Sequence, residues 1–200
     1  MLKHKKHFSI FLILCIAVIT LTACSARSNA VFPNSIAHTQ LNSAQQELLN
    51  RISLVNQEIL LFDFRVDSSF SGIEVWLEVY EYGVATERFD ALSIAFGEPS
   101  AFEGELSILV NRTNADYTVW GISLGIGGAL AQKTELTQVK QDAFLHGLMR
   151  ISAPIQIRDG EEIVLLKNYY ATEPGLAYPY AGLDLLEHST YTYIIKARFF

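Results

Sequence analysis

"GIEVWLEVYEYG", residues 72–83, indicates the fold class of this chain, because its side chains alternate in character with a period of two. One face of the extended chain is aliphatic and consists of Ile73, Val75, Leu77 and Val79. The other face carries acids and aromatic rings, namely Glu74, Trp76, Glu78 and Tyr80. This alternation predicts a strand of an antiparallel sheet, with one face buried and one face in water. Gly83 marks the turn that ends the strand.

Further stretches have the composition of strands and are separated by turn residues: 58–67, 104–112, 116–125 and 190–199. Within residues 155–167, Asp159-Gly160 stands between two apolar runs, which predicts a β-hairpin with a two-residue turn. Residues 134–149 fit either a helix or a pair of strands by the spacing of their apolar residues. The neighbouring strands, and the lack of a convincing cap, favour strands.

Seven or more short strands at turn-punctuated spacing predict a mainly β fold, an antiparallel two-sheet sandwich that is Ig-like or jelly-roll-like. The Cys–Trp–Cys signature of antibody domains is absent, so "Ig-like" describes the architecture only. We expect the core to include Val75, Leu77, Val79, Ile108, Val119, Ile195 and Ala197.

A short amphipathic helix is predicted from about residue 43 to residue 54. Ser43 and Gln46 have the spacing of a capping box. Apolar residues recur close to helical spacing at Leu41, Ala44, Leu48, Leu49, Ile52 and Val55. We interpret this apolar stripe as a packing face, and a surface for a partner helix is the alternative.

Residues 1–23 have the layout of a secretory signal peptide. Three lysines precede an uncharged apolar run over residues 8–20, and small residues follow it. The run is short for a membrane-spanning helix, which needs about 20 residues. Leu21-Thr22-Ala23-Cys24 resembles the lipobox of bacterial lipoproteins. The resemblance implies cleavage before Cys24, diacylglycerol on its thiol, and a lipid-anchored domain outside the cytoplasm, on the cell membrane or the outer membrane. An ordinary cleaved signal and an uncleaved apolar anchor are the alternatives.

Residues 24–40 are rich in Ser, Asn and Ala, which predicts a flexible tether ahead of a single folded domain over residues 41–200. From Cys24 onward, 12 Lys and Arg stand against 21 Asp and Glu, a formal charge of −9. This acidic balance gives no electrostatic footprint for nucleic acid, so we expect no nucleic-acid partner.

No pattern in the sequence indicates nucleophilic catalysis, a metal site or a cofactor. There is no Gly-x-Ser-x-Gly motif, and Gly125–Gly128 lacks the third spaced glycine of a dinucleotide loop. His188 adjoins Ser189, but neighbouring residues of an extended chain point to opposite faces. No His-x-x-x-His or Cys-x-x-Cys spacing suggests zinc. Asp63 and Asp67 are interpreted as two solvated acids rather than as ligands of a hard cation.

Carboxylates on the wet face of residues 72–83 and in the adjoining loops leave an enzymatic alternative open. Glycosidases need only two carboxylates at a suitable separation. Such a pair can be sought among Glu74, Glu78, Glu87 and Glu98. The enzyme question therefore stays open from the sequence, although a non-catalytic role is favoured.

"NYYATEPGLAYPYAGLD", residues 168–184, is interrupted by Pro and Gly and predicts a long loop that is too aromatic for disorder. Tyrosine combines a flat apolar ring with a polar hydroxyl, which suits sugar stacking or protein contact. The possible binding residues are Tyr169, Tyr170, Tyr178 and Tyr180. In the alternative interpretation, Tyr169 and Tyr170 end the preceding strand, and the loop covers a sheet edge or an end of the sandwich.

Together these features favour a non-catalytic, lipid-anchored envelope lipoprotein, attached to the membrane through Cys24, that binds a protein, glycan or small ligand. Two alternatives remain: a hydrolase of envelope polymers that uses surface carboxylates, and a structural subunit of a membrane complex. The sandwich fold does not decide among them, since it hosts all three kinds of function.

Overall fold

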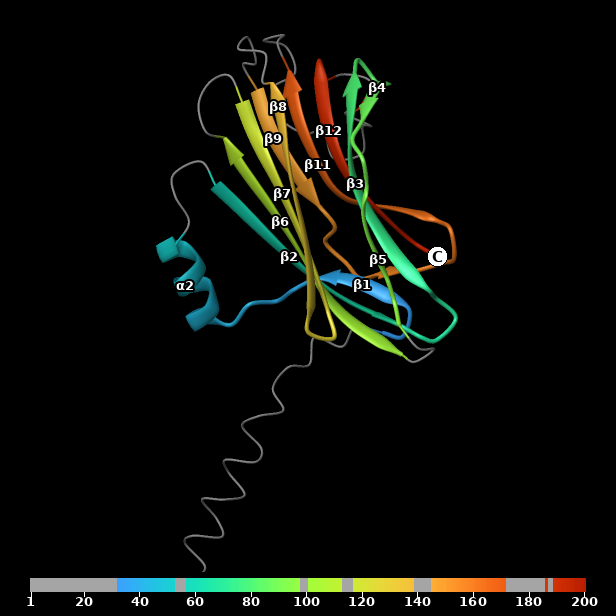
Figure 1. Cartoon of the computed structure of the whole chain (residues 1–200). Coiled ribbons are helices and arrows are strands. Elements are labelled where there is room, and N and C mark those ends of the chain that lie inside the picture. Colours follow the sequence, from blue (N-terminus) through green and yellow to red (C-terminus); the bar gives the residue numbers. More distant parts are fainter. Residues whose placement is uncertain are drawn as a thin grey trace, which may run out of the picture. The chain divides into compact units, whose positions relative to one another are not determined.

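The computed structural model describes residues 32–52, 57–97, 101–112, 117–138, 145–171, 186 and 189–200. Within these ranges the chain is mainly β and forms two antiparallel sheets, which confirms the predicted sandwich (Figure 1). Sheet A consists, in spatial order, of β10 (Ile155–Gln156), β1 (Ser35–His38), β2 (Gln57–Val66), β6 (Phe102–Arg112), β7 (Tyr117–Ile126) and β8 (Ala129–Gln138). Sheet B consists of β4 (Val84–Arg88), β3 (Gly72–Glu81), β12 (Tyr191–Phe199), β11 (Glu162–Ala171) and β9 (Leu145–Arg150), and β5 (Leu92–Ala95) also pairs with β3.

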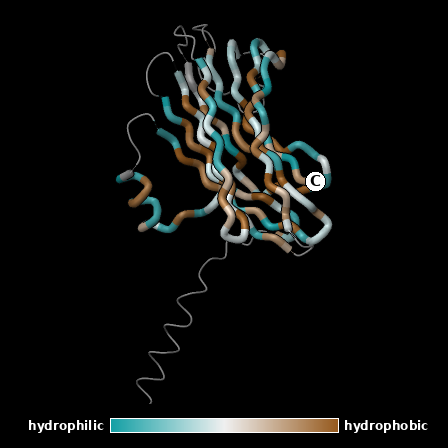
Figure 2. The backbone as a smooth tube through the Cα atoms, in the orientation of Figure 1, coloured by the Kyte–Doolittle hydropathy of each residue, from teal (hydrophilic) through white to brown (hydrophobic). Residues whose placement is uncertain are grey.

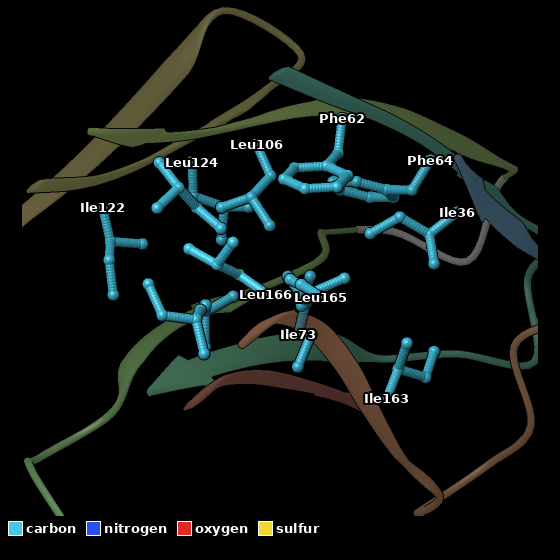
Figure 3. Packing of buried hydrophobic residues seen from close by; sticks show 14 of the residues in the cluster. Ile36, Phe62, Phe64, Ile73, Leu106, Ile122, Leu124, Ile163, Leu165 and Leu166 are labelled. Atoms are coloured by element: carbon cyan, nitrogen blue, oxygen red, sulfur yellow. The ribbon is translucent and has the colours of Figure 1, made fainter. Parts of the chain in front are cut away.

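The core lies between the two sheets and is built mainly from alternate residues of the longer strands β2, β3, β6, β7, β11 and β12. Figure 2 shows apolar and polar segments following one another along the strands. Figure 3 shows Phe62, Phe64 and Leu106 of sheet A packed near Ile73 and Leu166 of sheet B. The apolar side chains that these strands point inward from one sheet meet those of the other, and apolar burial stabilises the sandwich.

Six of the seven predicted core residues are buried: Val75, Leu77, Val79, Ile108, Ile195 and Ala197. The prediction is wrong for Val119, which is only half-buried on the outer face of β7. The inward face of β7 instead carries Trp120, Ile122, Leu124 and Ile126. Burying this face removes far more apolar surface from water than burying Val119 with its small neighbours Gly121 and Ser123.

The outer face of β3 differs from the predicted wet face. Trp76 is completely buried and Glu78 is buried as well. The guanidinium of Arg88, on β4, lies over the indole ring at 4.3 Å from its centroid, and Lys196, on β12, pairs with Glu78. Long basic side chains thus cover this face with their own stems and charges.

Asp159-Gly160 forms a turn, but the predicted hairpin is wrong. The Glu161 N–H donates to the carbonyl of Arg158 at 3.2 Å, and Gly160 has a φ of +69°. The strand before the turn, β10, pairs with β1 in sheet A, whereas β11 after it belongs to sheet B. The turn therefore carries the chain from one sheet to the other.

Two other turns join paired strands in the way predicted for Asp159-Gly160. Gly127 and Gly128 connect β7 to β8 with φ values of +55° and +87°. Tyr82 and Gly83 connect β3 to β4 with φ values of +49° and +80°. Two consecutive residues with positive φ match the twist of a two-residue hairpin. The strand interpretation of residues 134–149 is also confirmed, because β8 ends at Gln138 and β9 begins at Leu145; residues 139–144 lie outside the described ranges.

The predicted helix is present as α2 (Ser43–Ile52), but its cap and its surroundings differ from the prediction. The capping box is formed by Asn42 and Gln45, whose side chains each accept from the backbone N–H of the other at 2.9–3.0 Å. Leu48, on the apolar stripe, is 59% exposed, so the prediction of a packing face is wrong for this residue. Within the described ranges, no helix is long and apolar enough to cross a membrane.

β1 lies inside the segment predicted as a flexible tether, and for residues 35–38 that prediction is wrong. β1 pairs with both β2 and β10, and its Ile36 is completely buried in the core. Just before it, Asn34 binds the side chain and the backbone of Asp67. The sandwich thus begins before residue 41, and Cys24 with the signal segment lies outside the described residues.

Candidate functional site

The candidate site lies on the outer face of sheet B, where β3, β4, β11 and β12 run side by side. The period of two points Trp76, Glu78 and Tyr80 of β3 to this face. In the pairing of β3 with β12, Trp76 stands opposite Lys196 and Glu74 stands opposite Arg198. Sheet register thus brings together acids and bases that are more than a hundred residues apart in the chain.

Glu78 is the centre of this arrangement. One carboxylate oxygen accepts a hydrogen bond from the indole N–H of Trp76 at 2.7 Å. The other accepts from the Tyr80 hydroxyl at 2.7 Å and lies 2.7 Å from the ammonium of Lys196. The same ammonium is 2.9 Å from Glu162 and donates to the Tyr80 oxygen at 3.3 Å. We call these five residues the Glu78 network.

The charges of the network fix its protonation state. Burial by itself raises the pKa of Glu78, but hydrogen bonds from Lys196, Trp76 and Tyr80 outweigh it and hold this pKa below its ordinary value. Burial likewise opposes the charge of Lys196, yet its bonds to Glu78, Glu162 and Tyr80 raise its pKa above the ordinary value. Burial and the neighbouring Glu78 carboxylate raise the pKa of Tyr80. At neutral pH Glu78 is therefore a carboxylate, Lys196 an ammonium and Tyr80 a neutral phenol.

Beside the network, two guanidinium groups surround Trp76. The Arg88 guanidinium lies over the indole ring of Trp76, and the Arg198 guanidinium lies 5.9 Å from the centroid of the same ring. Both arginines also pair with Glu74. Cation–π and ionic contacts together hold the indole in place and keep it from water.

A shallow open hollow of about 390 Å³ adjoins the network. Its lining is Glu78, Tyr80, Ala85, Thr86, Glu87, Arg88, Glu162 and Lys196. All five residues of β4 are exposed, so the β4 wall of the hollow is open to solvent. The hollow offers carboxylate acceptors, cationic donors and a phenol, which is a set suited to hold a polar ligand by hydrogen bonds.

The carboxylates considered for catalysis are placed as follows. Glu74 and Glu78 are four residues apart on β3, and each is ion-paired with a basic residue of β12. Glu87 lines the hollow from β4. Glu98 lies outside the described residues.

The tyrosines chosen as possible binding residues divide into two groups. Tyr169 and Tyr170 lie in β11 and are buried, as in the alternative in which they end a strand. The ring of Tyr170 meets that of Tyr193 edge to face, with centroids 5.5 Å apart. Tyr178 and Tyr180 lie outside the described residues, and their role stays a prediction.

Among the described residues, no group of three or more His, Cys, Asp or Glu side chains is placed to hold a metal ion. His38 packs edge to face on Phe62, and burial, followed by the nearby Arg150, lowers its pKa. Asp67 accepts hydrogen bonds from Ser69 and Asn34, which lower its pKa. Ser189 is described and buried, whereas His188 beside it lies outside the described ranges.

Sequence reasoning missed Lys196, Glu162 and Arg88 as members of the site. A signal was present for Lys196, because the alternation of residues 190–199 places it on one face with Arg198. Its partner Glu78 could not be identified, because the pairing of β12 with β3 is set by the whole sheet. No protein-family model, curated protein or solved structure matches this chain.

Proposed function

We propose that this chain is a non-catalytic, lipid-anchored module of a bacterial envelope, held at the membrane through Cys24, and that its sandwich binds a protein or glycan partner. The observation that carries the binding role is the open hollow beside the Glu78 network. The polar groups of Glu78, Tyr80, Glu162 and Lys196 in its lining are already fixed by one another, so a ligand that binds them immobilises few additional side chains. Tyr80 adds a ring that can contact a sugar or a peptide.

The state of Glu78 supports binding rather than hydrolysis by the alternative carboxylate mechanism. A general acid acting near neutral pH needs a raised pKa, as when a carboxyl is placed in an apolar pocket. The pKa of Glu78 is lowered, and its two oxygens are held by Trp76, Tyr80 and Lys196. A carboxylate in this state serves as a fixed acceptor and anchor for its neighbours.

The anchoring part of the proposal rests on Leu21-Thr22-Ala23-Cys24. Since β1 begins at Ser35, the tether available after Cys24 is about ten residues. At full extension it spans roughly 35 Å. This reach suits a module that works close to the bilayer surface.

Intact-mass measurement of the protein purified from bacterial membranes tests the anchor. We expect a chain that begins at Cys24 and carries diacylglycerol, and we expect Cys24→Ala to abolish both the lipid and the cleavage. A wild-type chain with an unmodified Cys24 contradicts the proposal.

Cross-linking capture from intact cells tests the hollow. Glu87→Arg reverses a charge on the exposed wall, so we expect loss of the captured partner with an unchanged melting temperature. Glu103→Arg is the matched control, because Glu103 is also exposed on a strand but belongs to sheet A, where it pairs with Arg65. If Glu87→Arg captures as much of the partner as Glu103→Arg does, the result contradicts a binding role for the hollow.

A second pair of variants distinguishes the hollow from the tyrosine-rich loop. If Tyr178→Ala with Tyr180→Ala removes capture at unchanged thermal stability while Glu87→Arg does not, the binding surface is the loop. A large fall in stability in this double variant shows instead that the two tyrosines are structural.

A further inference from the structure

β8 is a long strand at the free edge of sheet A. It has ten residues and pairs only with β7 among the described strands. Its outward-facing side chains are exposed, including Leu130 and Leu136 at 65% and 56%. A strand edge of this length presents a row of backbone N–H and C=O groups that can template another strand.

The hairpin between β7 and β8 defines which backbone groups are free. Its two-residue turn, Gly127-Gly128, makes Ile126 and Ala129 the first paired residues. In an antiparallel ladder, hydrogen-bonded positions alternate along each strand. Positions 129, 131, 133, 135 and 137 therefore bond to β7, and the backbone groups of the intervening positions point away from the sheet. Those positions are Leu130, Gln132, Thr134, Leu136 and Gln138. At the last of them the carbonyl is already occupied, because it accepts from the Tyr193 hydroxyl at 3.0 Å.

We propose that β8 pairs antiparallel with β8 of a second copy of this chain, about a two-fold axis at Thr134, so that the two A sheets become one continuous sheet. A two-fold axis makes the same surface serve both subunits. With the axis at Thr134, the free backbone groups of Gln132, Thr134 and Leu136 on each strand find hydrogen-bonding partners on the other. At the two ends Leu130 faces Gln138, whose carbonyl already accepts from the Tyr193 hydroxyl of its own chain at 3.0 Å.

Charge complementarity selects this register. An axis at Thr134 places Lys133 directly opposite Glu135 of the partner subunit, and the same pair recurs on the other side of the axis. An axis at Lys133 or at Glu135 instead places like charges opposite each other, which is destabilising. An axis at Gln132 or Leu136 leaves both charged side chains without an opposite charge across the strands. Of these five central registers, only the one at Thr134 pairs both charges.

In an alternative interpretation, Lys133 protects the edge against strand addition, and we call such a residue a guard. An inward-pointing lysine on an edge strand opposes the addition of another strand. Here its ammonium already lies 2.9 Å from Glu135 of the same strand, and it also donates to the carbonyl of Asp90. The two side chains are only 24% and 20% exposed. The charge of Lys133 is thus neutralised by Glu135 within one chain. In the dimer, the two lysines and two glutamates alternate in sign around the axis.

A cysteine scan in the full chain tests the register. The residues at Gln132, Thr134 and Leu136 are all exposed on the same face of β8. At the axis, the two Thr134 Cα atoms are expected about 5.5 Å apart, which a disulfide spans. Thr134→Cys should therefore give a disulfide-linked dimer under mild oxidation, whereas Gln132→Cys and Leu136→Cys should not exceed the parent chain. Equal cross-linking at all three positions, or none at Thr134→Cys, overturns the proposal.

A charge-swap cycle tests the same interface without a new thiol. In the detergent-purified full chain, light scattering should give the mass of a dimer for the parent and of a monomer for Lys133→Glu. The swap Lys133→Glu with Glu135→Lys restores opposite charges across the axis and should restore the dimer, although each single change alone abolishes it. A monomeric parent, or a dimer indifferent to Lys133→Glu, shows that Lys133 acts as a guard or that the contact lies elsewhere. Either result overturns the proposal, whatever the fate of the hollow beside Glu78.

Discussion

The ammonium of Lys196 lies 2.7 Å from a carboxylate oxygen of Glu78, and the two side chains are only 13% and 10% exposed. The pair joins β12 to β3 across the outer face of sheet B. A fully solvated ion pair contributes little to stability, but this pair is largely shielded from solvent. Here Trp76 and Tyr80 satisfy the remaining capacity of the carboxylate. Removing one partner therefore leaves the other charge in a poorly hydrated place.

Lys196→Met should lower the free energy of unfolding by about 3 kcal/mol. This is the lower end of the cost found when one member of a buried ion pair is removed. Urea denaturation at neutral pH measures the change. Arg158→Met is the control: its exposed pair with Glu161 should contribute no more than about 1 kcal/mol. Adding Glu78→Gln to Lys196→Met should cost less than the sum of the single changes. Strict additivity contradicts a direct coupling.

The stability contributed by Glu78 should be lost in acid. Its pKa in the folded protein is below the ordinary value of 4.5, so the folded state favours the charged form. The contribution is fully present above the ordinary pKa and disappears as pH falls through the lower, folded pKa. The difference in unfolding free energy between the parent and Glu78→Gln should therefore be constant near neutral pH and shrink below about pH 4.5. A difference that grows in acid contradicts this assignment.

At alkaline pH, the change in stability is expected to come from Lys196. Its folded pKa lies above the ordinary 10.5, so its contribution is fully present below that pH and is lost only as pH rises through the folded value. Comparing the parent with Lys196→Met between pH 7 and pH 10 should give a constant difference. A fall within that range indicates that the ammonium is not held by Glu78 and Glu162.

The sheet architecture could be predicted because alternation is a local property of the chain. Residues 72–83 specify one aliphatic face, and that face is buried as expected. The opposite face was predicted to be wet, because Glu74, Glu78 and Tyr80 are polar. Whether such a face is covered depends on which bases lie opposite, and that register is not local. The same reason hid Lys196 and Arg88 from the sequence analysis.

The misplaced elements follow from the same limit. Asp159-Gly160 has the local chemistry of a hairpin turn, and a turn is present, but β10 and β11 join different sheets. Residues 35–38 are too few for their periodicity to be read, and their strand conformation comes from pairing with β2 and β10. The helix was predictable from its spacing, whereas the burial of its apolar stripe required a partner that the sequence does not specify.

The orientation of β7 in the core can be tested by a pair of truncations. Leu77 is almost completely buried, so Leu77→Ala should cost about 2–5 kcal/mol through lost transfer energy and the cavity left behind. Val119 lies on the outer face of β7, and Val119→Ala should cost much less. Thermal or urea unfolding measures both. Similar costs for the two variants contradict the inward orientation of Trp120 and with it the packing of sheet A.

The turn between the sheets offers a test of backbone conformation in which the added Cβ contacts no neighbouring residue. Gly160 has a φ of +69°, and an added Cβ meets no atom within 4 Å. Gly160→Ala should therefore destabilise the protein by about 1–2 kcal/mol through the left-handed conformation alone. Gly97 has equally open surroundings but no positive φ, so Gly97→Ala should be neutral or stabilising by up to about 1 kcal/mol. Because the N–H of Gly160 also donates to the carbonyl of Phe199 at 2.9 Å, a relaxed turn should loosen the end of β12, which hydrogen exchange detects. Equal stability of the two variants shows that the chain can pass between the sheets without a left-handed residue at position 160.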